Sequence, residues 1–163
     1  MVSTPEHAIF RQAVSFTNIA ADAFEKHLIK TPPDGGAMAP FVVNAVFGIE
    51  LYLKTLALQH GKTLHGHEIE RLFRKLPRAA KQEIERQIAT LSVTSRWACG
   101  INSIDDLQIV LDELDTAFID WRYLHENTAK ALKITFKPTI FLSEVLHSAC
   151  LTKASTEQAA ATA

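Results

Sequence analysis

The stretch FVVNAVFGIELYLKTLAL, residues Phe41–Leu58, decides the fold of this chain. It is apolar nearly all round an α-helix and is interrupted mainly by Asn44, Glu50 and Lys54. A helix that is apolar on every face is expected at the centre of a bundle, where neighbouring helices cover it. A membrane span fits less well, because its polar side chains would lie in hydrocarbon. The stretch therefore predicts a central helix over residues 40–60 that ends at Gly61.

The segments on either side of this helix also show helical periodicity. Apolar residues recur at spacings of three and four over residues 5–30 and 104–121, and Ser103 with Asp106 forms a capping box. Further helices are predicted for HEIERLFRKL, PRAAKQEIERQIATL and PTIFLSEVLHSACL. Strand-like alternation is confined to ITF, residues 134–136. We therefore expect an all-α, up-and-down helical bundle of five or six helices over residues 1–152, followed by a disordered C-terminal tail over 153–163.

Length, charge and cysteine content restrict the class of protein. The 163 residues fit one domain, and a net charge of −1 gives no overall attraction to nucleic acid or to a membrane surface. Cys99 and Cys150 are too few for a disulfide framework and indicate buried thiols in a reducing compartment. The N-terminus lacks a basic region followed by an apolar run. The expectation is a cytoplasmic protein that does not contact a membrane.

Two segments resemble the HEPN-domain family. In GIELYLKTLALQHGKTLHGHEIERLFRKL, residues 48–76, a helix of the form hydrophobic-Glu-x-x-Leu-Lys leads through a Gly-His turn into a short helix. FIDWRYLHEN, residues 118–127, is similar to the arginine-tyrosine segment that closes the third long helix of that family. Together the two segments span about half the chain, in the family's order.

The resemblance implies a helical bundle that is often a homodimer. Many HEPN members are metal-independent RNases of toxin–antitoxin or phage-defence systems, and others bind nucleotides or partner proteins. The nuclease members carry an arginine followed, after four to six residues, by a histidine. No arginine here has that spacing, since Arg122 is followed by His125 after only two residues. We expect an interaction or binding domain without a cofactor, with a homodimer partner and RNA, a nucleotide or a cognate protein as its other candidate partners.

The stretch DWRYLHEN, residues 120–127, has a catalytic and a structural interpretation. As the site of a metal-independent RNase in a dimer cleft, Arg122 would clamp a phosphate and His125 would transfer protons. As a structural tie, Arg122 would pair with Glu126 one turn later, or with Glu50 on the central helix. The structural interpretation is favoured, because ion-pair networks resemble catalytic sites in sequence. The RNase remains the alternative.

A second candidate group combines the central helix with the histidine-rich loop after it. Glu50 and Lys54 lie one turn apart, and His67 follows a glycine at the start of the next helix. With Glu126, these residues are predicted to form a ligand site or structural ion pairs. His60, His65 and His67 have no cysteine or carboxylate at an established ligand spacing, so no metal site is predicted.

The remaining features have simple structural interpretations. The basic run from Arg71 to Lys81 is interpreted as a solvated surface rather than a groove for nucleic acid. The aromatic residues Phe47, Tyr52, Phe73 and Trp121 are expected in the core. A third functional hypothesis is a small-ligand site between helices near Asn44, Thr55 and the TPPDGG loop.

Overall fold

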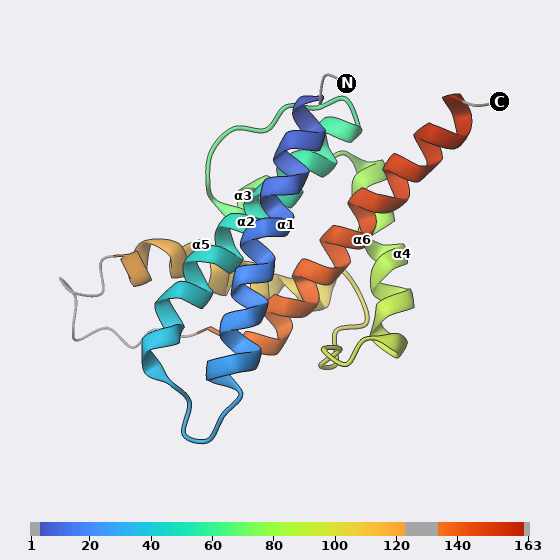
Figure 1. The fold of residues 1–163 in the computed structure, drawn as a ribbon. Helices are drawn as coiled ribbons and strands as arrows, with labels where there is room; N and C mark the ends of the chain where they lie inside the picture. The colour runs from blue at the N-terminus through green and yellow to red at the C-terminus, as the bar shows by residue number, and fades with distance from the viewer. Residues whose placement is uncertain (1–3, 123–133, 162–163) are drawn as a thin grey trace.

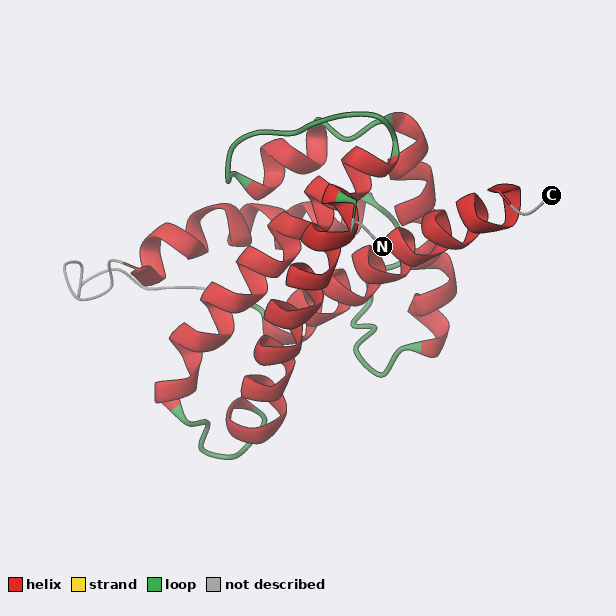
Figure 2. Ribbon diagram, turned by 45° about the horizontal axis from the view of Figure 1, so that its top comes forward, coloured by secondary structure: helices red, strands yellow, loops and turns green. Residues whose placement is uncertain are grey.

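The structure, a computed structural model, describes residues 4–122 and 134–161, without the side chains of 118, 119, 122 and 154–161. The described ranges contain helices and connections and no strand (Figure 2). The α-helices are α1 (Pro5–Ala23), α2 (Met38–Gln59), α3 (Ile69–Arg74), α4 (Arg78–Thr94), α5 (Gln108–Arg122) and α6 (Phe136–Ala161). A π-helical turn, Phe24–Leu28, continues α1, and 3-10 turns at Gly35–Ala37 and Asp105–Leu107 precede α2 and α5. The predicted all-α bundle is confirmed.

Helix α2 is the centre of the bundle. It packs against α1, α3, α5 and α6, and thirteen of its 22 residues are buried (Figure 1). Among the described helices, the one spanning Gly35–Gln59 alone is long and apolar enough to cross a membrane, yet 72% of its most apolar window is buried inside the protein. Burial by neighbouring helices is what the all-round apolar pattern of Phe41–Leu58 predicts.

Helices α1 and α2 approach closely at Gly48. A Cβ atom at this position would lie 2.4 Å from Thr17 Cγ2, 3.2 Å from Thr17 N and 3.3 Å from Ala13 O. The last two atoms belong to the backbone of α1, so a side chain could not be accommodated by rotation of Thr17 alone. The absence of a Cβ at Gly48 therefore sets the distance between the two helices.

The last helix is longer than the sequence predicts. α6 packs against α2, α4 and α1 through buried residues such as Phe141, Val145 and Ala149. It starts at Phe136, two residues before Pro138, and continues to Ala161, where the sequence suggests a disordered tail (Figure 1). KASTEQAAA contains no glycine or proline and is rich in alanine, the strongest helix former, so the backbone can continue as a helix.

Local details agree with most of the remaining predictions. Asp106 accepts hydrogen bonds from Asn102 N and Ser103 N, both at 2.9 Å, and these bonds lower the pKa of its carboxyl group. The capping box is thus confirmed. The expectation of two buried thiols is half wrong, since Cys150 is buried but Cys99 is exposed. Cys99 lies in the connection between α4 and α5, and connections generally run over the surface.

The aromatic side chains lie where the sequence places them. Tyr52 and Phe73 are buried in the core, while Phe47 and Trp121 are partly buried against it. Phe41 packs edge-on against Phe136 of α6, with ring centroids 5.1 Å apart. Such aromatic pairs add to the burial of apolar area that holds the bundle together.

Candidate functional site

Three of the predicted site residues meet in the structure. Glu50 of α2 is only 5% exposed, and its Oε1 lies 2.7 Å from Lys54 Nζ. Nδ1 of His67 lies 3.1 Å from both carboxylate oxygens of Glu50. Because the His67 side chain is 79% exposed, the contact ties the turn before α3 to the central helix at the surface.

This group satisfies a buried carboxylate. An ionised carboxylate inside a bundle is costly unless charged or hydrogen-bonding groups compensate it. Lys54 and His67 supply these groups to Glu50, and none of the three side chains lines either of the two cavities described below. The geometry fits the structural ion pair that was one of the two predicted roles.

The other predicted site residues lie outside the described part of the structure. The backbone of Arg122 forms the last residue of α5, but its side chain is not described. His125 and Glu126 fall between the described ranges. The predicted catalytic pair Arg122–His125, and the pairing of Arg122 with Glu50 or Glu126, therefore stay predictions.

The third hypothesis, a ligand site near Asn44 and Thr55, is not assembled. Asn44 Nδ2 donates to Pro40 O at 2.6 Å, and Thr55 Oγ1 donates to Leu51 O at 2.9 Å, so both side chains bind their own helix. A shallow pocket of about 450 Å³ does lie at the TPPDGG loop, beside Asp34 and His27, but neither Asn44 nor Thr55 lines it. Asn44 and Thr55 were therefore the wrong residues for this site, because both side chains form hydrogen bonds with backbone carbonyl groups of α2.

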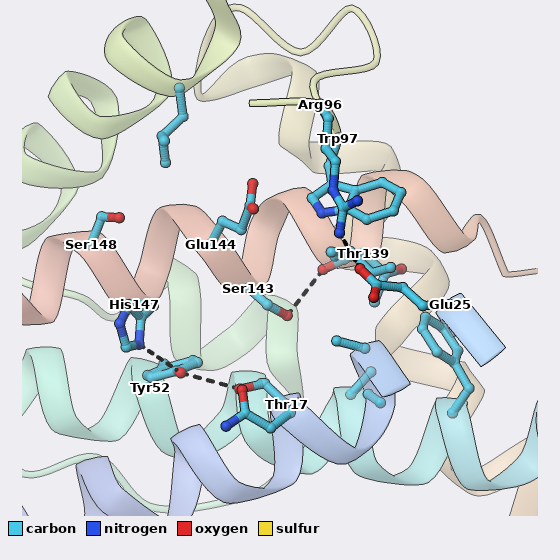
Figure 3. A pocket seen from close by; sticks show the side chains of 17 residues that line it. Thr17, Glu25, Tyr52, Arg96, Trp97, Thr139, Ser143, Glu144, His147 and Ser148 are labelled. Atoms are coloured by element: carbon cyan, nitrogen blue, oxygen red, sulfur yellow. Dashed lines mark hydrogen bonds and ion pairs between the residues drawn. The ribbon is translucent and has the colours of Figure 1, made fainter. Parts of the chain in front are cut away.

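A second candidate site is a partly open cavity of about 440 Å³ between α1, α2, α6 and residues 95–97 after α4 (Figure 3). Its wall contains apolar, aromatic and polar side chains from segments far apart in the sequence. The polar and aromatic ones are Thr17, Asn18 and Glu25 from the first helical segment, Phe41 and Tyr52 from α2, Arg96 and Trp97 from the connection, and Thr139, Ser143, Glu144, His147 and Ser148 from α6.

A hydrogen-bonded chain of three side chains joins α1, α2 and α6 at the cavity wall. The hydroxyl of Tyr52 lies 3.1 Å from Thr17 Oγ1 and 3.0 Å from His147 Nδ1 (Figure 3). Burial raises the pKa of Tyr52 to about 12, so the phenol stays protonated. Burial lowers the pKa of His147, because the interior disfavours the imidazolium ion, and the ring of Phe10 stacks on it at 5.4 Å. The chain is therefore uncharged at neutral pH.

The charged groups lie around the connection after α4. Arg96 forms an ion pair with Glu25, and its guanidinium lies 4.3 Å from the centroid of the Trp97 ring (Figure 3). Ser95 Oγ donates to Glu144 Oε2 at 2.5 Å and accepts a hydrogen bond from Trp97 N at 3.0 Å. The connection is thereby fastened to both the end of the first helical segment and α6.

Sequence reasoning missed this cavity. Tyr52 is expected only as a core residue, and Arg96, Trp97 and His147 belong to none of the predicted sites. The signals present in the sequence were the arginine-tryptophan pair inside a connection and four polar residues, Ser143, Glu144, His147 and Ser148, in the middle of α6. Neither feature of the sequence indicates that the connection after α4 lies beside α6.

Comparison with known proteins finds no match for this chain. No protein-family model, no curated protein and no solved structure matches the chain. Within the described residues, no three histidine, cysteine, aspartate or glutamate side chains gather in a way that could hold a metal ion. The geometry of the cavity is therefore what supports a functional proposal.

The Glu50–Lys54 pair generates a stability prediction. Lys54→Met should lower the free energy of unfolding by about 2–4 kcal/mol, because it leaves Glu50 buried without its cation. The double variant Glu50→Leu/Lys54→Met should recover more than half of that loss, since it removes the buried charge as well. Urea denaturation measures both changes.

The matched control for this prediction is Lys26→Met. Lys26 pairs with Asp22 at the same spacing of four residues, but both side chains are well exposed. Its loss should change the free energy of unfolding by less than about 1 kcal/mol. Equal effects of Lys54→Met and Lys26→Met would contradict the compensating role of Lys54.

The lowered pKa of His147 generates a pH prediction. As the pH falls through the ordinary histidine value of 6.5, the unfolded chain binds a proton at this residue and the folded chain does not. The free energy of unfolding should therefore decrease toward acid, and His147→Gln should remove this share of the decrease. Denaturation curves at a series of pH values measure it, with exposed His65→Gln as the control. Parallel pH profiles for wild type and His147→Gln would refute the desolvation of His147.

Proposed function

We propose that this protein is a helical binding domain that takes a small molecule into the cavity between α1, α2, α6 and residues 95–97. The observation that carries the proposal is a hollow of about 440 Å³ beside a close-packed core. Small-molecule sites typically have volumes of roughly 300–1,000 Å³, largely apolar walls and a few placed polar groups. The volume of this cavity lies in that range, and its wall combines apolar side chains such as Leu91 with the hydroxyls of Ser143 and Ser148.

The chemistry of the wall favours binding over catalysis. Tyr52 holds its proton, and His147 uses Nδ1 in the hydrogen bond with that phenol. Ser143 Oγ donates to Thr139 O at 3.1 Å, on its own helix, so within the described wall it has no hydrogen bond to a histidine base. Nucleophilic catalysis by serine needs such a base. The groups of the cavity are thus suited to hold a ligand in a fixed orientation.

The HEPN-like segments give this proposal its wider setting. On the basis of the hydrophobic-Glu-x-x-Leu-Lys helix and the Gly-His turn, we propose that the chain is a HEPN-like binding domain of a toxin–antitoxin, phage-defence or nucleotide-related system. A homodimer, a nucleotide, RNA or a cognate protein partner belongs to the same proposal. The alternative is a metal-independent RNase. It rests on Arg122 and His125 alone, and the described residues give it no further support.

Filling the cavity tests the proposal. Ser143→Phe places a ring in the hollow, whereas Ser15→Phe adds the same ring to an exposed position of α1 that does not line it. Both variants and wild type are screened by thermal unfolding against a panel of cationic, neutral and anionic metabolites. A ligand at 100 times its Kd should stabilise wild type by about 2.7 kcal/mol. Ser143→Phe should lose this stabilisation, and Ser15→Phe should keep it.

Two results would contradict the proposal. One is a panel in which no compound stabilises wild type. The other is a set of stabilising compounds that act equally on Ser143→Phe, which would place their site elsewhere on the protein.

A further inference from the structure

We infer that the ligand of this cavity is an organic cation, a protonated amine with an apolar or aromatic body, whose charge is accepted by Glu144. The inference rests on the proposed binding function and names its substrate class. It follows from the balance of charges in the wall and from the spacing of acceptors on α6.

The charges of the described wall leave one carboxylate uncompensated. Glu25 and Glu144 are its acidic residues, and Arg96 is its cation. Arg96 is paired with Glu25. Glu144 accepts a hydrogen bond from Ser95, and within the described residues no lysine, arginine or histidine nitrogen lies at ion-pair distance from it. A ligand that enters the cavity therefore meets a negative charge that a cation would neutralise.

The neighbouring histidine does not supply that cation. Burial lowers the pKa of His147, and Nδ1 of this ring is held by the hydroxyl of Tyr52. His147 is thus neutral near pH 7 and leaves the charge of Glu144 in place. An anionic ligand would have to share Arg96 with Glu25 while lying in the same cavity as Glu144, so the wall opposes it.

Acceptors on α6 complete a site suited to an ammonium group. The ring of Trp97 already carries the guanidinium of Arg96 at 4.3 Å, so the groups that can receive the charge of a ligand are those of α6. Glu144 and Ser148 lie one turn apart on α6, and both line the cavity. An ammonium group has three donors, which the Glu144 carboxylate and the Ser148 hydroxyl can accept. Ala21 and Leu91, which line the cavity and are partly exposed, offer apolar area for the body of the ligand.

A matched series of probes tests the sign of the charge. The probes are 2-phenylethylamine, 2-phenylethanol and phenylacetate, which share a ring and nearly the same size but are cationic, neutral and anionic. Isothermal titration calorimetry on the full chain at neutral pH should give an affinity for the amine at least about tenfold higher than for the alcohol, and weaker binding still for the acid. This comparison needs no variant and so does not depend on whether a variant folds.

Glu144→Gln tests the residue. Glutamine keeps the shape and an acceptor for Ser95 but removes the charge, so the affinity for the amine should fall about tenfold while that for the alcohol stays the same. Glu85→Gln is the matched control, because Glu85 is exposed on α4 and does not line the cavity. It should leave all three affinities unchanged.

The outcomes separate this inference from the proposed function. If the alcohol or the acid binds as tightly as the amine, the cationic ligand is refuted. If Glu144→Gln keeps the full preference for the amine, the role of Glu144 is refuted. In both cases binding in the cavity stands. The cationic ligand is also refuted, and binding in the cavity stands, if none of the three binds but a neutral or anionic compound of the panel does and is blocked by Ser143→Phe. If no compound of the panel binds, both proposals fail.

Discussion

The close approach of α1 and α2 at Gly48 is the constraint on which the rest of the structure depends. Because Gly48 has no side chain, the backbone of α1 at Ala13 and Thr17 lies directly against α2. Thr17 Oγ1, which donates to Ala13 O of its own helix at 2.9 Å, can then reach the hydroxyl of Tyr52 at 3.1 Å. A wider spacing would separate Thr17 from Tyr52 and remove the first link of the chain that continues to His147 on α6.

The cavity follows from how α6 meets this helix pair. Tyr52 bonds to His147 on α6, while the connection after α4 reaches across to Glu25 and Glu144 through Arg96 and Ser95. Hydrogen bonds and an ion pair thus join these segments around the hollow, and side chains do not fill it. Two kinds of polar group result: an uncharged chain that fixes the helices, and Glu144, whose charge is left for a ligand. On α6, His147 therefore has the structural role and Glu144, one turn earlier, has the proposed binding role.

The sequence predicts the helices better than the site. The all-round apolar pattern of Phe41–Leu58 predicts the central helix because burial on every face leaves a local signature. The pairing of Glu50 with Lys54 is predictable for the same reason, since residues four apart on a helix are neighbours. The cavity was not predicted, because His147 lies 95 residues from Tyr52 and helical periodicity gives no information on which faces meet. The helical continuation to Ala161 does not follow from hydrophobic periodicity, because KASTEQAAA has no large apolar residue, but it agrees with the helix propensity of alanine.

The most direct test of the helix contact is the free energy of unfolding of Gly48→Ala. In an open helix this substitution stabilises by about 1 kcal/mol, because alanine is the better helix former. Here the added Cβ would meet Thr17 and the Ala13 carbonyl, so we expect a net loss of about 1–3 kcal/mol. Adding Thr17→Ser, which removes Cγ2 but keeps the hydroxyl, should recover part of the loss. A gain in stability from Gly48→Ala alone would contradict the close contact between α1 and α2.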